Sequence, residues 1–233
     1  MFMQKIDMLH GDIRETLIQL AWPIVLTNLI QTALGIIDMI WIGKLGHEAV
    51  TAIGTASIFI NFAFALSMLV VTGSGVRVAQ SLGEGKEKQS QRYVKTGLIL
   101  SLLIALIYIV IIALFQDQFI AFFNIKESNI TNQAKSYLSH SLYGIPFLFI
   151  VSTYISILTS SGNTRLTFKA NAIGLALNII LDPLFIFGFG PIPKMGVAGA
   201  AWATNIARFI IFMILVKHTY KDFLESFKEP FEK

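Results

Sequence analysis

The apolar positions of this chain gather into six long runs separated by short polar segments. The runs cover approximately residues 17–42, 49–72, 96–115, 137–160, 170–189 and 196–216. Each supplies the ~20 residues that a helix needs to cross the hydrocarbon core of a bilayer. Backbone groups inside lipid must satisfy one another, so runs of this length are helices. The pattern predicts an all-α, polytopic membrane protein with six transmembrane helices, and one long connection over residues 73–95.

The composition supports the same class. Hydrophobic residues make up 55% of the 233 positions and charged residues only 14%, whereas soluble domains carry about 25% charged residues. This much apolar surface also excludes an intrinsically disordered chain. No internal repeat and no polar block separates one part of the chain from another, so residues 1–233 are expected to form a single membrane domain.

Basic residues between the runs are distributed unevenly, and this predicts the orientation. One side receives a large share of them, including Arg77, Lys86, Lys88, Arg92 and Lys95. The other side receives only Lys44, Lys126, Lys135 and Lys194. Because cytoplasmic loops are enriched in lysine and arginine, both termini are expected to be cytoplasmic in a multi-pass protein of the cell membrane. The formal charge of +4 is then a topology signal, and the lipid bilayer, rather than nucleic acid, is the expected partner.

Two carboxylates lie inside the apolar runs, where a charged side chain costs ~2.5–3.5 kcal/mol on insertion scales. Helical spacing places Thr27 and Gln31 on the same face as Asp38, and it places Asn171 and Asn178 on the same face as Asp182. The residues allow two interpretations. Either the acids are structural and are satisfied by neighbouring donors, or they form a proton or cation site that faces a cavity.

Prolines interrupt three of the runs, at Pro23, Pro146 and Pro183. Each removes one helical hydrogen bond and leaves the carbonyl four residues earlier without its donor. Pro183 directly follows Asp182, and irregular helices beside a carboxylate are a common way for secondary transporters to build a cation site or a hinge. Arg208 is the remaining charge inside a run, and its side chain is expected to extend to the cytoplasmic interface.

Several chemistries have no support in the sequence. Cysteine is absent and the four histidines are scattered, which argues against a metal centre. Gly85-Lys86 lacks the remaining residues of a P-loop, and neither aspartate stands in the context of an intramembrane aspartyl protease. No potassium-channel filter sequence is present. We therefore expect neither an enzyme nor a cofactor, and transport driven by an ion gradient remains.

Four stretches together resemble the multidrug and toxic compound extrusion (MATE) family of cation-coupled antiporters. They are LAWPIVLTNLIQTALGIIDMIWIGKLG, SLGEGKEKQSQRY, SSGNTR and NIILDPLFIFGFGPIPKMGVAGAAWATN. The resemblance implies one six-helix lobe of a twelve-helix transporter that exports cationic amphipathic compounds in exchange for H⁺ or Na⁺. It also implies that Asp38, Asn178, Asp182 and Thr204 bind the coupling cation, whereas Pro23 is the hinge of the first helix.

The chain is about half as long as members of that family, so only the amino-terminal lobe is expected. Either it is a fragment that lacks a second six-helix lobe, or two copies assemble into one transporter. Two other functions stay open. A flippase for lipid-linked sugars would need basic residues in its cavity to hold a diphosphate, and Arg208 is the only basic residue inside a run. A half-length chain could also assemble with a partner without transporting anything itself.

Overall fold

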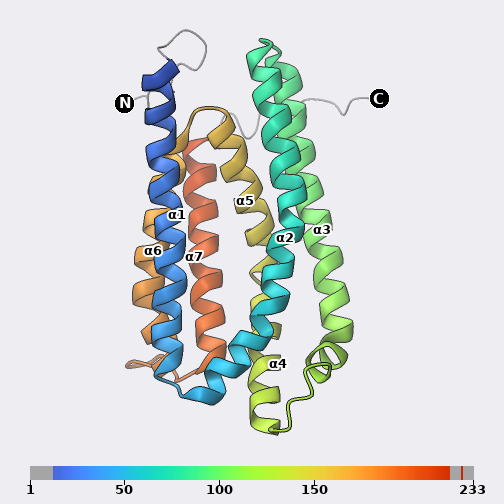
Figure 1. Cartoon of the computed structure of the whole chain (residues 1–233), viewed down its shortest axis with the longest axis vertical. Helices are drawn as coiled ribbons and strands as arrows, with labels where there is room; N and C mark the ends of the chain where they lie inside the picture. The colour runs from blue at the N-terminus through green and yellow to red at the C-terminus, as the bar shows by residue number, and fades with distance from the viewer. Residues whose placement is uncertain (1–12, 221–226, 228–233) are drawn as a thin grey trace.

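The computed structural model describes residues 13–220 and residue 227, which form a bundle of helices (Figure 1). The helices are α1 (Ile13–Gly43), α2 (His47–Gly83), α3 (Glu87–Ala121), α4 (Ser128–Leu142), α5 (Ile145–Ser160), α6 (Thr164–Phe187) and α7 (Val197–His218). Five of them are long and apolar enough to cross a membrane, and α4 with α5 forms a sixth, bent span. The predicted all-α membrane fold is confirmed.

The second and third spans extend well beyond the bilayer. α2 has 37 residues and α3 has 35, so at 1.5 Å per residue each is about 50 Å long. The sequence predicted a long connection over residues 73–95, and this prediction was wrong. The helices continue through most of this segment because Gln, Glu, Lys and Arg are good helix formers, and only residues 84–86 form the turn, where Gly85 has a φ of +71°.

The fourth span is broken in its middle. α4 and α5 meet at an angle of 51°, and Pro146 stands in the first turn of α5, where its missing N–H removes no helical hydrogen bond. Asn205 of α7 reaches into the break, and its Nδ2 donates to the carbonyl oxygen of His140 at 2.8 Å. The interruption is thus stabilised by a side chain from another helix.

The helices form two groups with a space between them. α1, α6 and α7 pack on one side and α2 and α3 on the other, with α5 behind and between the two groups (Figure 1). α6 and α7 are in close contact at Gly199, where a Cβ atom would overlap with the carbonyl of Phe185. This arrangement leaves the inner faces of α1, α2, α5, α6 and α7 around a common cavity.

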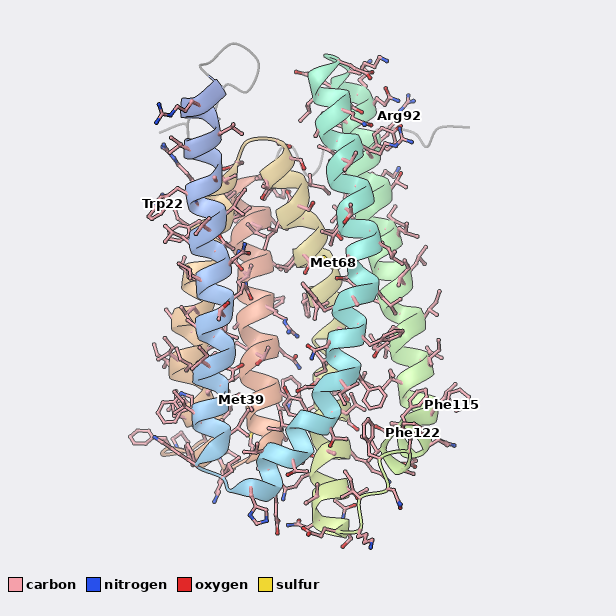
Figure 2. All side chains as sticks on the ribbon, in the orientation of Figure 1. Trp22, Met39, Met68, Arg92, Phe115 and Phe122 are labelled. Carbon is pink, nitrogen blue, oxygen red and sulfur yellow. The ribbon has the colours of Figure 1, made fainter. Side chains whose placement is uncertain are left out.

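The outer surface of the bundle is strongly apolar. Trp22 on α1 and Phe115 on α3 point outwards, away from the bundle (Figure 2), and both are exposed. Exposed apolar surface on this scale marks contact with membrane or protein rather than with water. Together with the lengths of the spans, it identifies a multi-pass membrane protein.

Candidate functional site

The two intramembrane aspartates come together between α1 and α6. α1 packs along α6, and this places the carboxyl groups of Asp38 and Asp182 close enough to form a hydrogen bond when one of them is protonated. Asp182 is only 1% exposed. The sequence predicted an acid on each of two helices, and the structure shows that the two acids form one pair.

Three of the four carboxylate oxygens of this pair have no hydrogen-bond donor among the described residues. Asp38 Oδ1, both carboxylate oxygens of Asp182 and Asn178 Oδ1 are buried without a partner. Buried polar atoms are rarely left unsatisfied, and exceptions call for an explanation. The interpretation in which neighbouring donors satisfy structural acids is therefore not supported. Carboxylate and amide oxygens are instead the ligands that hard cations prefer, and a carboxylate pair can equally hold a proton.

A cavity of about 540 Å³ opens beside the pair. Its wall includes four residues that helical spacing placed on polar faces, namely Thr27, Gln31, Asn171 and Asn178, and also Thr204, which the family resemblance implied. Met68 contributes from α2, on the opposite side of the space (Figure 2). Asp38 and Asp182 do not line this cavity. They lie one helical turn beyond the wall residues Leu34 and Asn178, so Asn178 stands between the acids and the cavity.

Hydrogen bonds fix several of these polar side chains. Gln31 Nε2 on α1 donates to Asn171 Oδ1 on α6 at 2.7 Å, and Asn171 Nδ2 donates to the carbonyl of Thr167. The hydroxyls of Thr27 and Thr204 each donate to a carbonyl of their own helix. Since Thr204 lines the cavity and its oxygen retains two lone pairs, this hydroxyl can still act as an acceptor or a ligand.

The two candidate hinge prolines lie inside continuous helices. α1 runs through Pro23 and α6 runs through Pro183 without a break. The Thr27 hydroxyl bonds to the carbonyl oxygen of Pro23 at 2.8 Å. Pro183 leaves the carbonyl of Ile179 without its helical donor, one turn before the acid pair. Hinge motion at either proline stays a prediction.

The position of Arg208 differs from the sequence prediction. Its side chain does not extend to the membrane interface but lies half-buried on the cavity wall, near the middle of α7. There it is within electrostatic range of Asp38 and Tyr137. The prediction was wrong because distance along a helix does not tell which way a long side chain turns. The cavity gives this side chain a space closer than the interface.

Tyr137 of α4 is a site neighbour that the sequence analysis did not single out. It is partly buried and lies within electrostatic range of Asp38, Asp182 and Arg208. Nothing in the sequence near position 137 separates it from an ordinary aromatic residue at the start of a span. Its place beside the acids follows only from the bend between α4 and α5.

Carboxylates enclosed by membrane-spanning helices next to a cavity are features typical of the class of helical membrane transporters. The model of the MatE family matches residues 23–184. This is well over half of the chain, and the chain therefore belongs to the MatE family, as its sequence resemblance predicted.

Curated relatives are multidrug resistance proteins. The chain is 28% identical over 202 residues to the probable multidrug resistance protein YoeA of Bacillus subtilis, and the aligned region covers 85% of this chain and 43% of YoeA. It is 30% identical over 197 residues to the probable multidrug resistance protein NorM of Listeria monocytogenes, and the aligned region covers 83% of this chain and 42% of NorM. The chain thus spans less than half the length of these relatives.

Solved structures give the same result for the fold. An outward-facing multidrug resistance MATE family transporter of the MOP superfamily aligns with a TM-score of 0.86 at 23% identity, over 94% of this chain and 48% of that one. A MOP superfamily transporter from Pyrococcus furiosus, described as having a binding pocket of reversed polarity, aligns with a TM-score of 0.86 over 95% of this chain and 48% of that one. The helices therefore have the fold of one lobe of the MATE transporters.

Proposed function

We propose that this chain is the cation-binding lobe of a secondary multidrug exporter, which exchanges cationic amphipathic compounds for H⁺ or Na⁺. The observation that carries the proposal is the pair of half-buried Asp38 and buried Asp182, in which three of the four carboxylate oxygens have no donor among the described residues. The pair lies one turn behind the wall of a cavity of about 540 Å³. A cavity of this size suits a drug-sized molecule, and the pair suits a small cation.

The wall residues give each ligand its place in this proposal. Asn178 and Thr204 offer oxygen atoms between the acids and the cavity and complete the cation site. Thr27, Gln31 and Asn171 provide polar contacts for the organic compound on the cavity side. Binding of the cation would change the position of α1 at Pro23, with Pro183 giving a second point of flexibility, and this would reshape the cavity so that the compound leaves.

A second lobe is part of the proposal, because the curated relatives are more than twice as long as the aligned region. It would be either a carboxyl-terminal half or another copy of this chain. Its expected place is the open side of the cavity, where α1 and α2 have few contacts with each other.

The first test is ethidium efflux from cells that express the chain, alone and together with a carboxyl-terminal lobe of a relative. Asp182→Asn should abolish efflux and leave membrane insertion intact. Asp117→Asn is the matched control, because Asp117 is an exposed acid on α3 that pairs with Lys135. Full efflux in the Asp182→Asn variant would contradict the assignment of the acid pair.

A direct binding measurement covers the case in which the half-length chain does not pump. We expect the purified chain to bind Na⁺ or take up a proton, and Asp182→Asn to weaken this by about tenfold or more, because one charged ligand is lost. Isothermal titration calorimetry with Na⁺ and proton release measured in weak buffer distinguish the two ions. No binding of either ion to the wild-type chain would favour a lobe that only assembles with a partner.

A lipid-linked sugar flippase is the second candidate, and the position of Arg208 on the cavity wall favours it. A diphosphate carries at least two charges, however, and Arg208 is the only charged residue among those that line the cavity. Binding of a polyprenyl diphosphate that is lost in Arg208→Ala would make the flippase the better assignment.

A further inference from the structure

Arg208 is the one charged side chain that links the candidate cation site to the cavity. The carboxylates of Asp38 and Asp182 lie behind the wall, whereas Arg208 is part of it. Its guanidinium stays charged under all ordinary conditions. It lies within electrostatic range of Asp38 and forms no ion pair with any acid of the described residues.

The guanidinium of Arg208 can therefore lie either towards Asp38 or towards the cavity. When the acid pair is vacant, the carboxylate of Asp38 attracts the guanidinium and partly neutralises it. When a cation fills the pair, this attraction falls and the positive charge is free to turn to the cavity. Since an arginine side chain is long and flexible, a small rotation changes how far the charge extends into the cavity. In a space of low dielectric, such a charge repels another cation strongly.

We propose that Arg208 is an internal competitor for the acid pair, and that it couples occupancy of the pair to release of the organic cation. The coupling cation displaces Arg208 from Asp38, and the displaced guanidinium then repels the organic cation from the cavity. This inference rests on the proposed function, since it requires that the cavity binds an organic cation. It adds the residue that transmits the effect from one site to the other.

Ethidium binding to the purified chain tests the proposal without knowledge of the coupling ion. Arginine, glutamine or lysine stands at position 208, and each of these three proteins is prepared with and without Asp38→Asn. The affinity of all six proteins for ethidium is measured by fluorescence at one pH and one ionic strength. Asp38→Asn removes the attraction for Arg208 and so imitates an occupied pair. We expect it to weaken ethidium binding by about tenfold with Arg208 present, and by about two- to threefold in the Arg208→Gln background.

Arg208→Lys keeps the charge, and in this background Asp38→Asn should again weaken binding by about tenfold. This rescue separates a role of the charge from a role of the side chain in packing. An equal effect of Asp38→Asn with and without Arg208 would overturn the inference and leave the proposed function intact. Absence of ethidium binding in every protein of the set would contradict the proposed function, and the inference with it.

Discussion

Gly144 lies at the bend between α4 and α5, where its missing side chain leaves room for Asn205 of α7. A Cβ atom at position 144 would overlap with Oδ1 and the adjoining carbon of the Asn205 amide. That amide donates the hydrogen bond to the carbonyl of His140 in the broken part of the span. The glycine at position 144 therefore allows Asn205 of α7 to donate to the carbonyl oxygen of His140 beside the break.

We expect Gly144→Ala to lower the free energy of unfolding by about 1–3 kcal/mol, because Asn205 must move and its partly buried hydrogen bond to His140 is weakened. Thermal unfolding of the purified chain in detergent measures the change. Gly54→Ala in α2 is the control, since nothing lies within 4 Å of the place that a Cβ atom would take there and alanine favours a helix more than glycine does. Equal melting temperatures for both variants would contradict the role of Gly144.

The candidate site could be predicted in part from single residues. A carboxylate inside an apolar run stands out, and helical spacing identified Asn171 and Asn178 beside Asp182. The pairing of Asp38 with Asp182 required the packing of α1 on α6, which no pattern within one helix contains. The same is true of Arg208 and Tyr137, because their directions depend on the cavity and on the bend of the fourth span.

At the scale of the elements, α1 is the helix with the least support from the rest of the lobe. It packs mainly on α6 and has few contacts with α2 and α7. Much of its surface is exposed, including Trp22, Leu29 and Ile36. The hydrogen bond from Gln31 to Asn171 is a side-chain contact that joins α1 to α6.

Gln31→Leu should therefore loosen α1 on α6, because Asn171 loses its partner and a buried amide oxygen is left unsatisfied. Hydrogen–deuterium exchange followed by mass spectrometry is expected to show faster exchange in the α1 peptides around Pro23, with little change in α3. Thr32→Val provides the comparison, since the Thr32 hydroxyl bonds only to the carbonyl of Asn28 in its own helix. The same exchange rate in both variants would argue against a role of the Gln31 hydrogen bond in holding α1 on α6.

The helices themselves could be predicted, whereas their ends could not. Apolar runs report where a helix lies in lipid, but they say nothing about how far it continues into water. The polar residues 73–95 predict a connection, although most of them extend α2 and α3. The sequence predicts an interruption at Pro146, whereas the structure places Pro146 at the start of α5 and the interruption at Gly144.

At the scale of the whole molecule, the two ends of the bundle differ in their basic residues, and the orientation follows as a prediction. Lys86 lies in the turn between α2 and α3, and Lys126 follows α3 at the opposite end. Because the chain has no cysteine, single cysteines can be introduced without other changes. With a membrane-impermeant maleimide, Lys126→Cys should be labelled in intact cells, and Lys86→Cys only after the cells are permeabilised. The reverse pattern would contradict cytoplasmic termini.

The chain spans less than half the length of its relatives, and its cavity is open on one side. In this lobe the cavity is walled by five helices, and the exposed inner surfaces of α1 and α2 border the side without a wall. A second lobe on that side would close the cavity and give the two halves a common substrate space. Whether it is a carboxyl-terminal half or another copy is answered by the efflux experiment with and without the added lobe.

The length of α2 and α3 has a practical consequence for imaging. Both helices exceed the ~30 Å hydrocarbon thickness by several turns, and only residues 84–86 join them. A soluble helical bundle inserted in place of this turn would continue both helices without a flexible linker. Such a fusion would provide a rigid fiducial outside the micelle, and particles of a 25.9 kDa chain could then be aligned by electron cryo-microscopy.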